Sequence, residues 1–184
     1  MSRGRGGGGG GGRGGGPNQR TWGDHSLNQQ IRQSESVEQL RDLIVARRDT
    51  FTQIHTSTAF HTLARLSKRA HGQRNKENIS ETCELLKHKA RQQHKQFGPQ
   101  AIANTLWALA TIGDKADAAL MAALSRKAVM SADKFNPQEI ANTLWALARM
   151  GQEGDVVLME ALARRAVDII HTFNPQAIAN TLWA

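Results

Sequence analysis

One string of residues recurs along this chain at a fixed spacing, and that spacing constrains the fold more than any other feature. The string Phe97-Gly-Pro-Gln-Ala-Ile-Ala-Asn-Thr-Leu-Trp-Ala-Leu-Ala recurs from Phe135, 38 residues later, and again from Phe173 as far as Trp183. A period of this length is typical of a solenoid, in which each unit is one pair of elements that buries its apolar face against its neighbours. The repeat therefore predicts a stack of similar units.

The recurring string predicts the first helix of each unit. Asn136 suits an N-cap, Pro137 the first helical position, and Glu139 the third, where its carboxylate completes a capping box. Gly113 and Gly151 follow the last periodic residues and suit left-handed helix ends, so the helix is expected to span about 14 residues. Apolar pairs around each cap predict hydrophobic staples: Phe97/Ile102, Phe135/Ile140 and Phe173/Ile178.

A second helix is predicted in each unit after a short turn. Asp117 and Asp155 are the expected N-caps. Apolar residues then recur at i, i+4 and i+8, as on one face of a helix: Leu120, Leu124 and Ala128, with Leu158, Leu162 and Ala166 at the equivalent positions. The sequence thus predicts an all-α solenoid of helix-turn-helix repeats.

The same phase continues towards the N-terminus in weaker form. Residues 79–94 match a second helix, and residues 36–47 look like one more helix of that type. Thr56–Leu66 matches a first helix that lacks the tryptophan: Leu63-Ala-Arg-Leu aligns with Leu106-Trp-Ala-Leu if a five-residue insertion lies near His71–Ser80. At the other end the chain stops inside a third first-type helix, so we expect a fragment of a longer array. The expected organisation is a disordered tail over 1–20, a linker and first helix over 21–50, a degenerate repeat over 51–96, repeats over 97–134 and 135–172, and a truncated repeat over 173–184.

Positive charge is concentrated in two blocks. Residues 1–20 carry four arginines and no acid, among glycines that leave almost nothing to bury, and residues 51–96 hold nine Lys or Arg against three acids. Such blocks are the usual electrostatic footprint of a polyanion partner, although a solvated surface gives the same pattern. The Gly/Arg tail is similar to RNA-binding RGG segments, and a plain flexible linker is the alternative.

The repeated string resembles the octotricopeptide repeat family and, more loosely, the helical repeats of FAST-kinase-like and RAP-domain proteins. The resemblance covers roughly residues 51–184 and is strong in the two full copies. It implies an α-solenoid that binds RNA in mitochondria or chloroplasts and acts in RNA processing, stability or translation; nucleus and cytoplasm are the alternative compartments. No RAP domain lies in this sequence, so the resemblance implies no nuclease-like activity.

Polar residues of the first helices are the candidate base-reading positions. A mid-helix asparagine competes with the backbone, so three copies of it need a reason. One interpretation is a ladder of asparagines bonded between neighbouring helices; the other is that Asn and Gln reach base edges. Positions that vary between copies are candidates for specificity. The whole set comprises Gln100, Ala101, Asn104, Thr111, Gln138, Glu139, Asn142, Arg149, Gln176, Ala177 and Asn180.

Tryptophans and paired basic residues complete the candidate set. Trp107, Trp145 and Trp183 either stack on bases or fill the core; their leucine neighbours favour the core. Basic pairs of the second helices, Arg126-Lys127 and Arg164-Arg165, recur in one phase, with Lys89 in the same slot upstream, and predict a stripe along an RNA backbone, or else a solvated outer face. Lys87 and Arg91 are further candidates for phosphate contacts, from the basic segment over residues 51–96.

Other classes of function find no support in the sequence. Nothing pairs a nucleophile with a base, no phosphate-binding glycine loop is present, and the single cysteine and the histidine spacing give no metal site, so neither an enzyme nor a cofactor is expected. No apolar run approaches a membrane span. Two hypotheses stay open. The chain is a solenoid that binds single-stranded RNA, or it is an armadillo- or HEAT-like scaffold for other proteins.

Overall fold

All secondary structure that the computed structural model describes is helical, which confirms the predicted fold class. The described residues are 19–114, 117–151 and 155–183, with side chains from residue 26 on. Residues 1–18 of the expected tail lie outside these ranges. The helices are α1 Gln19–Gln33, α2 Val37–Ala46, α3 Gln53–Ser67, α4 Gln73–Gln93, α5 Pro99–Ile112, α6 Ala118–Met130, α7 Pro137–Arg149, α8 Val156–Asp168 and α9 Pro175–Trp183.

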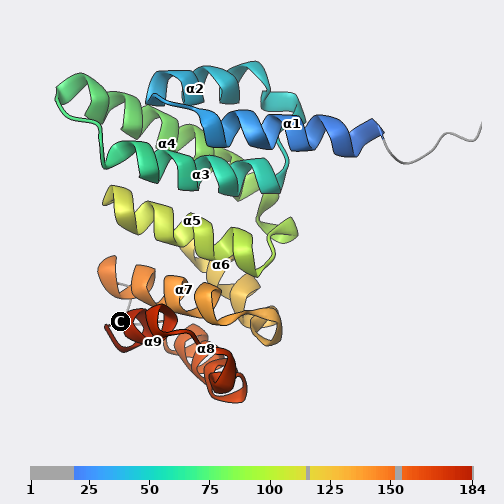
Figure 1. The fold of residues 1–184 in the computed structure, drawn as a ribbon, viewed down its shortest axis with the longest axis vertical. Helices are drawn as coiled ribbons and strands as arrows, with labels where there is room; N and C mark the ends of the chain where they lie inside the picture. The colour runs from blue at the N-terminus through green and yellow to red at the C-terminus, as the bar shows by residue number, and fades with distance from the viewer. Residues whose placement is uncertain (1–18, 115–116, 152–154, 184) are drawn as a thin grey trace, which may run out of the picture.

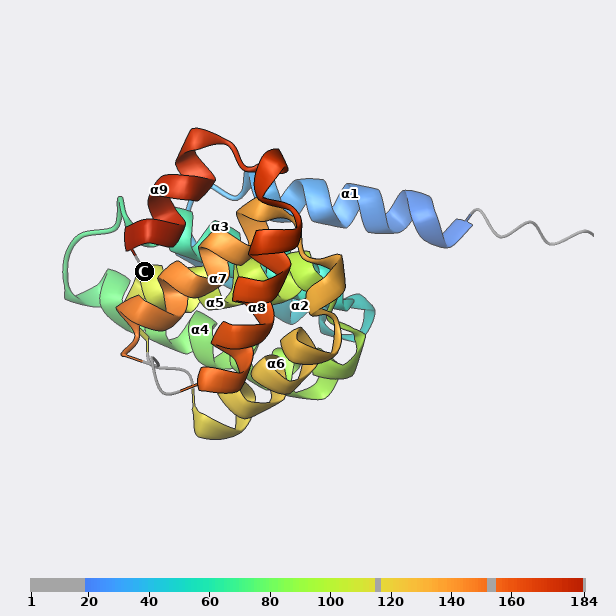
Figure 2. The ribbon, with the colours of Figure 1, turned by 90° about the horizontal axis from the view of Figure 1, so that it is seen from below.

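The helices form two layers, and successive helix pairs stack in chain order, as Figure 1 shows. Helices α1, α3, α5, α7 and α9 pack side by side and are called the A layer; α2, α4, α6 and α8 form the B layer. Figure 2 looks along the stack and separates α3, α7 and α9 from α4 and α6. Alternation of the two layers along the chain is the arrangement of a helix-turn-helix solenoid.

The predicted caps are confirmed where the structure describes them. Asn136 and Glu139 form a reciprocal capping box at the start of α7, and the carboxylates of Asp117 and Asp155 accept hydrogen bonds from Leu120 N and Leu158 N. Gly113 ends α5 with a φ of 80°, a left-handed conformation that favours glycine. A short 3-10 turn precedes each later A-layer helix: η1 Arg48–Thr50, η2 His94–Gln96, η3 Ala132–Lys134 and η4 Ile170–Thr172.

The array begins earlier than the sequence predicts. Residues 19–33, which fall in the expected tail and linker, form α1, which packs against α3. Leu27 and Ile31 are buried on that side. Apart from Trp22, these two residues are the only large apolar residues of α1, and they form a single i, i+4 pair, so the periodic signal was too short to recognise.

The insertion in the degenerate repeat is also longer than predicted. The N-caps Thr52 of α3 and Gly98 of α5 lie 46 residues apart, eight more than the 38-residue period. Helix α4 accommodates most of the difference, since it begins at Gln73 instead of residue 79 and spans 21 residues. The alignment of α3 with α5 therefore moves by three positions from the predicted one, and this changes which α3 residues are equivalent to the repeat's polar positions.

Candidate nucleic-acid interface

Four repeated positions of the A-layer helices share one solvent-facing stripe. In α5 they are Gln100, Asn104, Trp107 and Thr111, at spacings of four, three and four residues, which places them on one helix face. All four are exposed or half-buried. The stripe continues in the neighbouring helices as Gln138, Asn142, Trp145 and Arg149 of α7 and as Gln176, Asn180 and Trp183 of α9. We call this surface the A-layer face.

Helix α3 supplies different residues at the same positions. With the N-caps of α3 and α5 aligned, Thr58 is equivalent to Asn104, His61 to Trp107 and Arg65 to Thr111. The degenerate unit therefore places an imidazole ring where the later units have an indole. Sequence reasoning missed His61 and Arg65 because the predicted insertion was three residues too short.

Aromatic rings of the A-layer face pair between neighbouring helices. The His61 and Trp107 rings stack with centroids 5.0 Å apart, and Trp145 lies 6.0 Å from Trp183. Two cations sit over the indoles: Lys68 Nζ lies 5.1 Å from the Trp107 centroid, and Arg149 Cζ lies 5.8 Å from that of Trp145. Rings and cations thus lie together on one surface.

The prediction that the tryptophans belong to the core is confirmed only in part: two of them pack against the core and none is fully buried. Trp107 and Trp145 are half-buried at the edge of the core, and Trp183 is 60% exposed. Their phase explains this position, since each lies seven residues after the exposed glutamine of its helix, which is close to two full turns. Leucines flank each tryptophan in sequence, but they point to another side of the helix.

The predicted asparagine ladder is not formed. Asn104, Asn142 and Asn180 are half-buried, and none of their side chains makes a hydrogen bond within the described ranges. The amides of α7 and α9 instead line a small hollow of about 50 Å³, whose walls are Gln138, Ala141, Asn142, Asn174, Gln176, Ala177 and Asn180. Asn174 Oδ1 accepts a hydrogen bond from Ala177 N, whereas the other amides of the hollow make none in the described ranges and are free to pair with a ligand.

The variable position of the repeat has a structural role in α7. Glu139 accepts a hydrogen bond from Asn136 N at 2.9 Å. Burial raises the pKa of Glu139, and the bond from Asn136 opposes that shift. Ala101 is half-buried and Ala177 is buried, so this position lies deeper than the exposed Gln position beside it.

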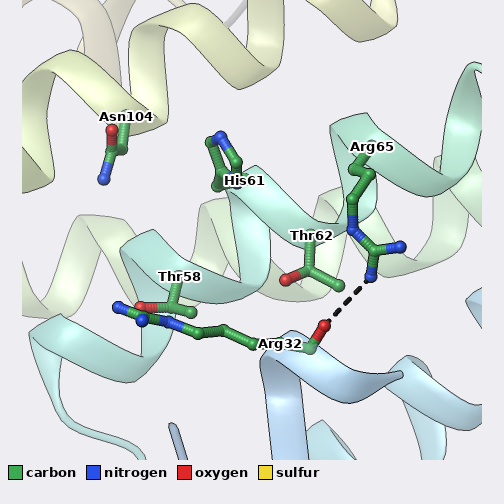
Figure 3. Close-up of a pocket in the computed structure, with 6 residues that line it drawn as sticks. All are labelled: Arg32, Thr58, His61, Thr62, Arg65 and Asn104. Carbon is green, nitrogen blue, oxygen red and sulfur yellow. Dashed lines mark hydrogen bonds between the residues drawn. The ribbon is translucent and has the colours of Figure 1, made fainter. Parts of the chain in front are cut away.

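A larger cavity lies where α1, α3 and α5 meet. It measures about 340 Å³ and is lined by Arg32, Thr58, His61, Thr62, Arg65 and Asn104. In Figure 3 the Arg32 side chain extends beside Thr58, while the guanidinium of Arg65 turns to the carbonyl oxygen of Arg32. Arg65 donates to that oxygen at 3.1 Å and to the carbonyl oxygen of Ser34 at 2.8 Å. The lining contains no carboxylate.

The charges around this cavity act on the pKa of His61. The residue is exposed on the A-layer face, but partial loss of solvent around the ring lowers its pKa, and the positive charges of Arg65, Arg32 and Lys68 lower it further. No acidic group contributes to the shift. The ring is therefore neutral at pH 7, and the space around it carries a net positive potential.

The basic residues predicted in α4 are held by protein partners. Lys87, whose side chain is 7% exposed, lies 3.0 Å from a carboxylate oxygen of Asp114. Burial alone lowers the pKa of Lys87, but hydrogen bonds from its ammonium to Glu84 and Asp114 outweigh burial and raise the pKa. Lys89 donates to Arg48 O at 2.6 Å, and Arg91 pairs with Asp117. These three side chains join successive repeats. The charges of Lys87 and Arg91 are paired with carboxylates, whereas Lys89 is bound to a main-chain carbonyl oxygen.

The basic pairs of α6 and α8 differ from each other in whether protein groups bind them. Arg165 donates to Phe135 O at 3.1 Å, and Arg164 pairs with Glu160 at 3.3 Å. Arg126 is exposed and Lys127 half-buried, and neither has an ion-pair partner in the part of the chain that the structure describes. All four belong to the B layer, away from the rings and amides of the A-layer face.

No group of three or more His, Cys, Asp or Glu residues that suits a metal ion occurs in residues 19–114, 117–151 and 155–183. Over the same ranges, no helix has the length and apolar character needed to cross a bilayer.

Comparison with known protein families gives one decisive match. The model of the RNA-editing substrate-binding complex 6 protein family (RESC6) matches residues 36–184, which is most of the chain. The chain belongs to this family. Membership implies a subunit of an RNA-binding complex, not a catalytic family, and mitochondrial RNA processing as its context. The resemblance to octotricopeptide repeats is therefore corrected to this family, and a chloroplast location has no support. No curated protein matches the chain.

Proposed function

We propose that the A-layer face binds single-stranded RNA directly, and that this contact is the chain's share in holding RNA-editing substrates within the complex. The observation that carries the proposal is the combination of partly exposed rings, unbonded amides and cations on one continuous stripe. Single-stranded RNA is recognised by this combination, since its unstacked bases pair with amides and stack on rings.

The rings supply contacts that suit any base. Trp107, Trp145 and Trp183 recur once per repeat, and His61 takes the equivalent place in α3. Every base has a π face, so a ring at each repeat favours binding without selecting a sequence. Lys68 and Arg149 over two of the indoles add positive charge near the path of the phosphates.

The amides supply contacts that distinguish bases. The donors and acceptors of Asn104, Asn142 and Asn180 have no protein partner in the described ranges, and the hollow between α7 and α9 gathers two Gln and three Asn side chains. An amide that pairs with a base edge selects that base, whereas a phosphate contact only positions the strand. We propose that Gln138, Asn142, Gln176 and Asn180 contribute sequence preference.

The B-layer cations enter the proposal differently. Lys87, Lys89 and Arg91 join repeats, so we leave them out of the RNA path. Arg126 and Lys127 are open to solvent but lie on the other layer, and we expect them to affect RNA affinity only through the overall charge.

Fluorescence anisotropy with fluorescent single-stranded RNAs tests the proposal. Asn142→Ala should change the preference among RNA sequences and leave the slope of log K against log salt unchanged, because the lost contact is with a base. Arg126→Gln is the matched surface control and should keep the preference. If the wild-type chain binds RNA and Asn142→Ala and Arg126→Gln weaken that binding equally, the result would contradict an A-layer face that reads bases.

A second role, in binding proteins of the complex, is favoured by a separate surface. Large apolar side chains of α8 and the turn after it are exposed, among them Val157 at 66%, Val167 at 72% and Ile170 at 60%. Exposed apolar groups of this size are typical of protein contacts, and both the next repeat of a longer array and another protein of the complex suit them. Because α8 belongs to the B layer, we propose that such a protein and RNA use different residues.

A further inference from the structure

We propose that the cavity between α1, α3 and α5 is a phosphate anchor, which binds a backbone phosphate of the RNA strand that the A-layer face holds. This proposal deepens the proposed function and rests on it. Neither the family match nor the repeated string points to this cavity, because its charged residues, Arg32 and Arg65, lie outside the recurring string.

The cavity differs from the other hollow of the A-layer face in charge and size. The hollow between α7 and α9 is lined by neutral side chains and measures about 50 Å³, whereas this one measures about 340 Å³ and is lined by two arginines. Neutral amides suit base edges, and guanidinium groups suit phosphates. The two ends of the face are therefore built for different parts of a nucleotide.

The positive charge in the cavity is not neutralised by the protein. Arg32 has no carboxylate partner in the described ranges, and Arg65 bonds to two main-chain carbonyl oxygens, which orient its guanidinium without cancelling its charge. Hydroxyl groups of Thr58 and Thr62 stand beside these cations and can donate to a phosphate oxygen.

The aromatic rings beside the cavity determine which part of the RNA lies next to the bound phosphate. His61 lines the cavity and stacks on Trp107, so the ring column of the A-layer face begins at the cavity wall. Asn104 lines the cavity as well and belongs to the amide column. A phosphate held by Arg32 thus belongs to a nucleotide whose base lies beside the first ring pair, which sets the register of the strand along the repeats.

His61 also supplies a local reporter of occupancy. The surrounding groups are Arg32 from α1, Arg65 and Lys68 from α3, and Trp107 and Asn104 from α5. A bound phosphate opposes the three positive charges, so the pKa of His61 should rise when RNA binds. An NMR titration of the His61 ring with and without RNA measures this rise.

The experiment replaces Arg32 by glutamine in the full chain and uses Arg126→Gln as the control with the same change of charge. With a single-stranded RNA, R32Q should weaken binding about tenfold and lower the salt slope by about 0.7, the loss of one phosphate contact. R126Q should change neither by a comparable amount. Arg65 is left intact because its bonds hold the end of α1.

A series of RNAs, each with one methylphosphonate linkage, locates the anchored phosphate. One linkage in the series should weaken wild-type binding and have no further effect on R32Q. The anchor is overturned if R32Q and R126Q bind alike, or if no linkage loses its effect in R32Q, while Asn142→Ala still changes sequence preference. Failure of the wild-type chain to bind any RNA would instead overturn the proposed function itself.

Discussion

At the scale of single residues, the half-buried tryptophans separate stability from binding. Trp145 contacts Trp183 and Arg149 on the A-layer face, while Leu147, two residues later, is 2% exposed in the core. The two residues share a helix but face different surroundings. Substitutions at these two positions should therefore have opposite signatures.

Trp145→Ala is expected to weaken RNA binding by about 1–3 kcal/mol, the contribution of one base stacked on a ring, and to reduce stability less than Leu147→Ala does. Leu147→Ala removes a core side chain and should cost about 2–5 kcal/mol. Chemical denaturation and RNA anisotropy on both variants check this. If the Trp145→Ala protein unfolds as readily as the Leu147→Ala protein, Trp145 acts as a core residue, which would contradict this expectation.

Lys87 gives the opposite case of a basic residue without an RNA role. Lys87→Met removes the partner of Asp114 and leaves that carboxylate, 20% exposed, without its cation. We expect a stability loss of about 1–3 kcal/mol and an unchanged salt slope of RNA binding. A lower slope together with unchanged stability would show that Lys87 contacts phosphates.

The lowered pKa of His61 makes stability depend on pH. Because burial and the nearby cations disfavour the protonated ring in the folded state, the unfolded chain takes up a proton here at a higher pH. The free energy of unfolding should therefore fall as the pH drops below about 6.5, the ordinary histidine value. Urea titrations at about pH 7.5 and about pH 5.5, one on each side of that value, measure this fall. The free energy of unfolding should fall less in His61→Gln than in the wild type. Identical pH dependence in both proteins would contradict the assignment.

At the scale of helices, α1 is the element that the sequence pattern did not predict. Ile31 is fully buried, and Arg65 of α3 bonds to two carbonyl oxygens at the end of α1. We expect Ile31→Ala to cost about 2–4 kcal/mol and to expose the amides of α1 to hydrogen exchange before those of α5. Equal protection of α1 in the variant and the wild type would show that the helix does not depend on this contact.

Some elements could be predicted from the sequence and others could not, because the sequence signals that mark them differ in kind. The caps of α6, α7 and α8 and the end of α5 were predictable, because side chains at fixed positions satisfy the helix ends. Helix α1 was not, since two buried residues make no period. The α3 register was missed because leucines recur every three or four residues in any amphipathic helix, so Leu63 aligned equally well three positions out of place.

The candidate site was predicted in part for a related reason. The Gln, Asn and Thr/Arg positions of the A-layer face follow from repetition alone. The basic cavity does not, because it joins α1, α3 and α5, and a contact between helices of different repeats leaves no periodic trace. The partners of Lys87 and Arg91 were hidden too, since Asp114 and Asp117 lie in the next repeat's turn.

At the scale of the whole molecule, the two layers divide the work. B-layer side chains such as Lys87 and Arg91 join successive repeats, and A-layer side chains face outward with rings, amides and cations. A solenoid suits this division, because each repeat adds one ring and one amide to the same stripe. Membership of the RNA-editing substrate-binding complex 6 protein family gives that stripe an RNA context.

The measurement that tests the central claim most directly is photo-crosslinking of the full chain to single-stranded RNA that carries 4-thiouridine, with the crosslinked peptides identified by mass spectrometry. We expect crosslinks on α3, α5, α7 and α9, centred on the residues around His61, Trp107 and Trp145. The B-layer peptides around Arg126 and Arg164 should stay unmodified. Crosslinks confined to α4, α6 and α8 would contradict an RNA-binding A-layer face.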